Sequence, residues 1–153
     1  MNDIDDPKSW DLPVSLAPLV SQVRMAILSG VDHEFLRDEE VAALGVTAAQ
    51  FTIIAHVVKG RAQSACELCN FMDYDRGAMS RMIDRLETKG LVRRVPLPHN
   101  RRTMALEVTD AGKAAFPKMQ ACLTKVMNRL LKGVAKTQVR EAERTLRKIL
   151  ANS

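Results

Sequence analysis

Residues 75–103 constrain this chain more than any other stretch, because a helical pattern there passes directly into a hairpin pattern and carries the whole net charge. The 153-residue chain has a formal net charge of +5. The stretch has three acidic and eight basic residues, which leaves fifteen of the 23 cations and fifteen of the 18 anions for the remaining chain. The eight basic residues are Arg76, Arg81, Arg85, Lys89, Arg93, Arg94, Arg101 and Arg102. A solvated cationic face is the ordinary explanation of a charged helix, but a surplus confined to one helix and its hairpin favours a surface for duplex nucleic acid.

Composition predicts one folded unit without a membrane partner. A hydrophobic fraction of 46% and a charged fraction of 27% are typical of globular proteins, and seven Gly with six Pro leave little low-complexity sequence. No apolar run reaches the ~18 residues of a membrane span, and the first residues are acidic where a secretory signal is basic. We therefore expect a cytoplasmic protein, and the odd number of cysteines, three, indicates reduced thiols rather than a disulfide framework.

Long helices are expected at both ends of the chain. Residues 1–13 are acidic and contain two prolines, which predicts an extended arm. Apolar residues then recur at helical spacing over 14–36, and helical patterns return over 110–132 and 137–151 with Gly133 between them. Their apolar stripes exceed what one small domain covers, so these helices are expected to need a partner.

Short helices with recognisable caps fill the middle of the chain. The segment DEEVAALG has acids at its start and Gly45 at its end, which is typical of a helix. Thr47, Ser64 and Asp75 are each placed to cap the N-terminus of a following helix, and Gly90 to end the last of them. Two β-prone stretches, 91–95 and 103–108, then flank a Pro, His and Asn turn.

The helix over residues 76–89 has one apolar and one polar face. Met79, Met82, Ile83 and Leu86 share the first, whereas Arg76, Gly77, Ser80, Arg81, Asp84 and Thr88 share the second. Helix, short helix, turn, helix and hairpin is the order of a winged helix-turn-helix, whose second helix enters the major groove while the hairpin lies along a neighbouring groove. The fold class predicted is therefore mainly α with a small β-hairpin wing.

The stretches DRGAMSRMIDRLETKGLVRR and HNRRTMALEVTDAG resemble the MarR family of bacterial transcription regulators. The resemblance implies a winged helix-turn-helix region over 37–109 and dimerisation helices over 14–36 and 110–153. It also implies a homodimer on a pseudo-palindromic double-stranded DNA operator, most often a repressor released by a small organic effector such as an aromatic carboxylate or phenol. The effector pocket stays unassigned; Arg24 and His33 are candidates, although surface roles are favoured for both.

The resemblance also suggests which residues contact DNA. On the recognition helix they are Arg76, Ala78, Ser80, Arg81 and Arg85, with Arg81 the first choice for reading a base because Arg can bind guanine bidentately. Ser64 is a candidate for a phosphate contact. In the wing the candidates are His99, Asn100, Arg101 and Arg102, where Asn100 replaces an Asp usual in the family and should hold Arg102 less firmly. An ion pair made by Asp84 and Arg85 is an equal alternative to DNA contact by Arg85.

Cys66 and Cys69 raise a competing hypothesis of a thiol-based redox or metal-responsive regulator, or of a thiol or metal protein that does not bind DNA. Their C-x-x-C spacing places them on one helix face, but no strand precedes them and no second pair completes a zinc site, so buried unreactive cysteines are favoured. Catalysis is not expected, because the sequence has no phosphate-binding loop, nucleophile elbow or His-rich motif. We expect no cofactor and no metal.

Overall fold

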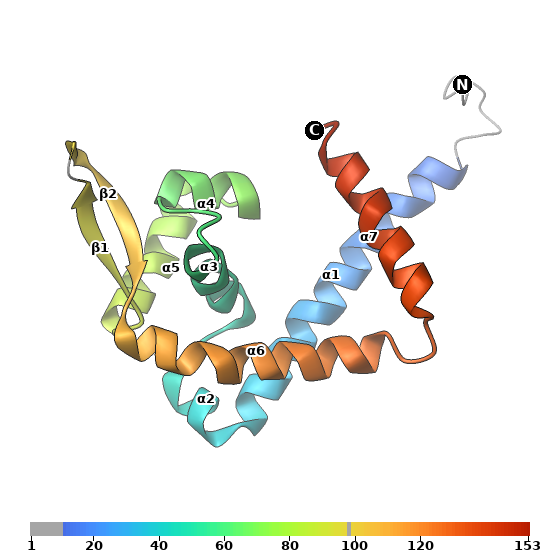
Figure 1. The fold of residues 1–153 in the computed structure, drawn as a ribbon, viewed down its shortest axis with the longest axis horizontal. Helices are drawn as coiled ribbons and strands as arrows, with labels where there is room; N and C mark the ends of the chain where they lie inside the picture. The colour runs from blue at the N-terminus through green and yellow to red at the C-terminus, as the bar shows by residue number, and fades with distance from the viewer. Residues whose placement is uncertain (1–10, 98) are drawn as a thin grey trace.

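The computed structural model describes residues 11–97 and 99–153, with side chains described for 15–97, 99 and 104–153. Helices and one antiparallel hairpin follow each other in this part of the chain, so the predicted mainly helical class with a small β-hairpin is confirmed (Figure 1). The elements are α1 (Asp11–Arg37), α2 (Glu39–Leu44), α3 (Ala48–Val58), α4 (Ala65–Met72), α5 (Arg76–Thr88), β1 (Val92–Leu97), β2 (Asn100–Val108), α6 (Asp110–Leu130) and α7 (Lys136–Leu150).

The three predicted N-caps are confirmed. Thr47 Oγ1 accepts from the Gln50 amide at 3.2 Å, Ser64 Oγ from the Glu67 amide at 3.2 Å, and Asp75 Oδ1 from the Ala78 amide at 2.8 Å. Each cap satisfies an amide that has no partner inside its own helix. The predicted end of α2 at Gly45 is also confirmed. Gly45 caps the C-terminus of α2 with φ 59°, a left-handed conformation that glycine reaches without steric cost.

Helix α1 is longer than predicted at its start. It begins at Asp11, so residues 11–13 are helical rather than part of an extended arm, and residues 1–10 of the predicted arm lie outside the described residues. Pro13 is compatible with this start because the amides of a first helical turn have no partner inside the helix. Pro18 consequently lies inside the helix.

A single apolar core joins α1, α3, α5 and α6. The ring of Phe51 on α3 lies between Phe35 of α1 and Phe116 of α6, with centroid distances of 5.7 Å on both sides. Met79, Ile83 and Leu86 of α5 are fully buried in the same cluster. The predicted division of α5 into an apolar and a polar face is therefore confirmed, and the polar face is left outside.

The hairpin, residues 92–108, is called the wing below. Val92 pairs with Val108 at its base, and the register continues to Pro96 opposite Met104 before shifting at Leu97. Both strands extend beyond the predicted limits toward the tip. Pro96 is tolerated there because a two-stranded hairpin has free edges where a missing amide donor breaks no ladder bond.

Helix α7 and the N-terminal half of α1 extend away from the rest of the molecule (Figure 1). They carry large apolar side chains that are exposed: Leu16, Leu19, Val20 and Val23 on α1, and Leu146, Ile149 and Leu150 on α7. Among residues 11–97 and 99–153, no helix has both the length and the apolar character needed to cross a bilayer. The exposed apolar side chains thus form an uncovered surface within the described chain.

Gly112 allows α6 to pack closely against the base of the wing. A Cβ atom at this position would collide with the carbonyl oxygen of Leu91 and lie 2.6 Å from Val108 Cγ1. We predict that Gly112→Ala lowers the free energy of unfolding by about 1–3 kcal/mol, although glycine to alanine inside a helix normally raises it by about 1 kcal/mol. Urea unfolding followed by circular dichroism measures this, and Lys113→Ala, exposed at the next position, should change stability by less than about 0.5 kcal/mol. A Gly112→Ala protein as stable as the parent would contradict the close packing.

Candidate nucleic-acid interface

The polar face of α5 forms an exposed cationic surface. Arg76, Ser80, Arg81 and Arg85 are exposed, whereas Ala78 is half-buried. Arg81 extends back along the helix, so that its Nη1 atom lies 3.3 Å from the place a Cβ atom of Gly77 would occupy. Because Gly77 has no side chain, the Arg81 guanidinium can lie close to the helix surface near its N-terminus.

Ser64 lies at the N-terminus of α4 but is already engaged as its cap. The Glu67 carboxylate also reaches this end, because its Oε2 atom accepts from the Gln63 amide at 2.5 Å. A carboxylate beside a helix N-terminus weakens the attraction of that terminus for a phosphate. A phosphate contact by Ser64 therefore stays a prediction, and the structure supplies a competing anion.

The wing tip is described only in part. His99 is exposed in the turn, while the backbone of residues 100–102 belongs to β2. The side chains of Asn100, Arg101 and Arg102 lie outside the described residues, so their roles in DNA contact stay predictions.

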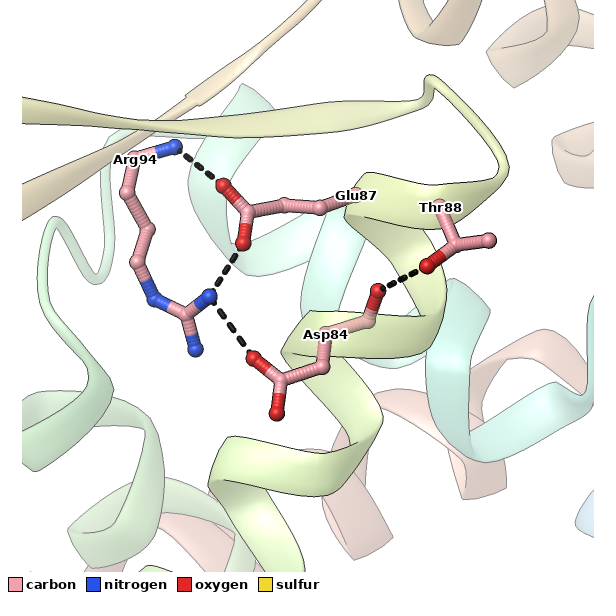
Figure 2. A network of polar contacts seen from close by, with 4 residues as sticks. All are labelled: Asp84, Glu87, Thr88 and Arg94. Atoms are coloured by element: carbon pink, nitrogen blue, oxygen red, sulfur yellow. Dashed lines mark hydrogen bonds and ion pairs between the residues drawn. The ribbon is translucent and has the colours of Figure 1, made fainter.

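Arg94 connects the wing to α5, as Figure 2 shows. Its Nη1 atom lies 2.8 Å from Asp84 Oδ1 and also binds Glu87 Oε2, and its backbone amide donates to Glu87 Oε1 at 2.8 Å. Thr88 Oγ1 donates to the Asp84 carbonyl one turn along. The first strand of the wing is thereby held at the C-terminal half of α5.

Two further cations of residues 75–103 have partners inside the fold. Arg93 donates to Glu107 on the opposite strand through Nε and Nη2, at 3.1 and 2.8 Å. Lys89 Nζ donates to the Gly45 carbonyl and, at 3.3 Å, to Gln50 Oε1. Burial, and secondarily the charge of Arg85, lowers the pKa of Lys89. The predicted surface for duplex nucleic acid therefore does not have Lys89 and Arg94 as free cations, because acceptors across the fold hold them, whereas Arg93 is paired but remains exposed.

The alternative of an ion pair between Asp84 and Arg85 is also wrong, because Asp84 pairs with a different arginine. Asp84 pairs with Arg94 of β1, while Arg85 is exposed on α5. Neighbours at i and i+1 point in different directions on a helix, so Asp84 faces the wing and Arg85 does not.

The cysteines are not uniformly buried as favoured from the sequence. Cys66 is exposed, Cys69 is intermediate and Cys122 is buried. Leu68 is the buried residue of α4, and a position two residues away points to the opposite side of a helix. That geometry explains why Cys66 faces solvent.

Helix α5 buries one face and exposes arginines on the other, α4 precedes it, and the antiparallel wing follows it. This arrangement defines a winged helix-turn-helix DNA-binding protein. The model of the MarR family matches residues 44–103, which span α3, α4, α5 and most of the wing. The chain is also similar to the multiple antibiotic resistance protein MarR of Escherichia coli, with 30% identity over 116 residues that cover 75% of this chain and 81% of that protein. The chain belongs to the MarR family of transcriptional regulators.

Further similarities agree with this family. The chain is 26% identical over 132 residues to the HTH-type transcriptional repressor MdtR of Bacillus subtilis, covering 86% of this chain and 79% of that protein. Among solved structures, a mutant of MarR from E. coli complexed with operator DNA superposes with a TM-score of 0.75 at 25% identity, covering 93% of this chain and 98% of that one. The family is one of regulators rather than enzymes.

The Arg94 contacts predict an unequal effect of two neighbouring substitutions. Arg94→Met leaves the half-buried Glu87 and the more exposed Asp84 without their shared cation, and we expect a loss of about 1–2 kcal/mol in unfolding free energy. Arg93→Met removes an exposed pair and should cost under about 1 kcal/mol. Urea unfolding of both variants measures the difference, and an Arg94→Met protein no less stable than Arg93→Met would exclude an anchoring role for Arg94.

Proposed function

We propose that this protein binds a pseudo-palindromic operator as a homodimer and represses transcription by covering a promoter. The observation that carries the proposal is the face of α5, where Arg76, Arg81 and Arg85 are exposed while the opposite face is buried. Arg81 is the proposed base-reading residue, and Ala78, Ser80 and the wing residues His99, Asn100, Arg101 and Arg102 are proposed neighbours of the duplex. The names of the relatives, a repressor and a protein crystallised with its operator, support this proposal. Because its proposed target is chromosomal DNA, we place the protein in the cytoplasm. We assign it no enzymatic activity.

Two copies of the recognition helix require a dimer, and the exposed apolar surface of α1 and α7 supports one. A second copy would cover Leu19 and Val23 of α1 and Leu146 and Leu150 of α7, which are exposed in one chain. We therefore assign residues 14–36 and 110–153 to dimerisation and 37–109 to DNA binding. Paired α5 helices would then occupy half-sites about one helical turn apart.

A small organic effector would release the repressor. Such a ligand changes operator binding only if it prefers a conformation in which the two recognition helices no longer fit the DNA. The family resemblance points to an aromatic carboxylate or a phenol bound between the dimerisation helices and the winged region.

We predict that operator binding depends steeply on salt and on Arg81 in particular. Because bound arginines displace counterions from phosphates, affinity should fall linearly with salt on logarithmic axes. Arg81→Ala should reduce the preference for operator over unrelated duplex about ten- to hundredfold, whereas Arg102→Ala should weaken binding to all duplexes alike. Fluorescence anisotropy with a duplex selected in vitro measures both quantities.

The matched control is Arg144→Ala, which removes an arginine from the cationic side of α7, away from α5. This variant should bind the operator like the parent protein. Salt-independent binding, an equal loss in Arg81→Ala and Arg144→Ala, or a monomer at micromolar concentration would contradict the proposal.

A redox-responsive regulator is the second candidate function, and the exposure of Cys66 favours it. Cys66 and Cys69 are three residues apart on α4, the helix next to α5 in both sequence and packing. Hydrogen peroxide would oxidise the two thiols to a disulfide and be reduced to two waters, and strain in α4 would shift α5.

We predict, for this second candidate, that peroxide abolishes operator binding by the parent protein and spares a Cys66→Ala, Cys69→Ala double variant. Anisotropy before and after peroxide, followed by reduction with dithiothreitol, provides the measurement. Cys122→Ala serves as the control, because Cys122 is buried and burial, the largest cause, raises the pKa of its thiol. Equal resistance of the parent and the double variant would reject the redox function.

A further inference from the structure

The part of the chain outside residues 75–103 is neutral in sum but contains two segments of opposite charge. Residues 1–10 have three aspartates and one lysine, so their side chains carry a formal charge of −2. Residues 132–148 have six basic and two acidic residues, so their side chains carry a formal charge of +4. Salt screens such charges beyond about 8 Å at physiological ionic strength, so the two segments attract each other strongly only when they lie close together.

Most cations of residues 132–148 lie on one exposed face of α7. The residues of this face recur every three or four positions and line a shallow hollow of about 480 Å³: Arg140, Glu143, Arg144, Arg147, Lys148 and Ala151. Arg147 pairs with Glu143 at 2.6 Å. Arg140, Arg144 and Lys148 form no ion pair with any residue that the structure describes. These six residues are called the α7 cationic face below.

The spacing of the cations on this face favours an anionic occupant. Arg144 lies four positions after Arg140 and four positions before Lys148, and like charges at this spacing on a helix repel each other. Glu143 offsets the charge of only one of the four cations, that of Arg147. An acidic segment bound to the α7 cationic face would relieve this repulsion.

The α7 cationic face stays uncovered when the apolar side of the same helix is covered. Ile149 lies nine positions after Arg140, and Leu146 lies two positions after Arg144, and both spacings place two residues on opposite sides of a helix. A second copy that covers Leu146 and Ile149 therefore leaves the α7 cationic face in solvent. The occupant of this face must come from outside the apolar interface.

We propose that the α7 cationic face binds residues 1–10 of a second copy, with Asp3, Asp5 and Asp6 placed against Arg140 and Arg144. This binding rests on the proposed function, because it requires the homodimer, and it adds a polar contact to the apolar interface between the copies. One exposed ion pair contributes little, whereas several charges on one segment act together. The acidic segment would therefore tighten the dimer at low ionic strength.

A second copy is the source of the acidic segment because α1 and α7 of one chain are not packed together. Helix α1 packs on α2, α3 and α6, and among the described residues α7 has no comparable contact with it. In the homodimer, Leu19 and Val23 of one copy and Leu146 and Leu150 of the other would cover each other, which places the start of α1 beside α7 of the other copy. Ten extended residues reach about 33 Å, which is enough to pass around a helix about 10–12 Å wide.

The test exchanges the signs of the two surfaces in the full-length protein. Asp5→Lys with Asp6→Lys, or Arg140→Glu with Arg144→Glu, should each raise the dissociation constant of the dimer about three- to tenfold at low salt, measured by analytical ultracentrifugation. All four substitutions in one chain should restore most of the parental value, because the attraction returns with its signs exchanged. At about 1 M salt, which screens charges beyond about 3 Å, every variant should agree with the parent protein.

Lys59→Glu with Arg61→Glu is the matched control, because both residues are exposed and lie in the region assigned to DNA binding. This variant should keep the parental dissociation constant of the dimer. Carbodiimide coupling, which joins a carboxylate to an amine as the reagent takes up the water released, then identifies the chain that supplies the acidic segment. It should link residues 1–10 to Lys148 between two chains, and Lys148→Arg should not form that product.

Three results would each overturn the contact between residues 1–10 and the α7 cationic face: no rescue by the four substitutions, coupling within one chain only, or an effect that persists at about 1 M salt. Operator and unrelated duplex should be bound normally by Arg140→Glu with Arg144→Glu at micromolar protein, where mass action keeps the dimer intact. Weaker binding there would instead assign the face to nucleic acid and overturn the proposal. A monomeric parent protein would refute the proposed function, whereas an intact dimer without any charge effect refutes only this contact.

Discussion

Burial of one face of α5 is the constraint on which the rest of this structure depends. Fully burying an apolar side chain contributes about 1.5–3 kcal/mol, and Met79, Ile83 and Leu86 are all completely buried. An exposed ion pair contributes about 0–1 kcal/mol, so the apolar face and not the charges determines how the helix is rotated. Because the apolar face is turned inward, Arg76, Arg81 and Arg85 on the opposite face are exposed.

Some cations of residues 75–103 join elements of the fold, whereas the arginines on the polar face of α5 are exposed. Arg94 joins the wing to Asp84 and Glu87 of α5, and Lys89 joins the C-terminal end of α5 to Gly45 and Gln50. These contacts fix the helix relative to the wing on one side and to α2 and α3 on the other. A rigid arrangement of this kind lowers the ordering cost of binding a duplex with both elements at once.

Helix α1 connects the surfaces on which regulation would depend. Its N-terminal half exposes Leu19 and Val23, Leu28 lines a cavity between α1, α3 and the end of α4, and Val31 and Phe35 lie in the core. One continuous 27-residue helix therefore runs from the uncovered apolar surface through the cavity wall into the winged region.

Local chemistry along the chain determined the helix starts at Thr47, Ser64 and Asp75 and the two faces of α5, because a cap or a helical stripe involves residues three or four positions apart. Fold class and the exposed arginines of α5 could be predicted from those patterns, and the family from the resemblance carried by residues 75–112. Tertiary structure alone decided that Arg93 and Arg94 are paired, that Cys66 faces solvent and that His56 meets Phe71 beside a cavity. These outcomes depend on how separate elements pack, and no spacing within one element specifies which distant acceptor or ring a side chain will meet.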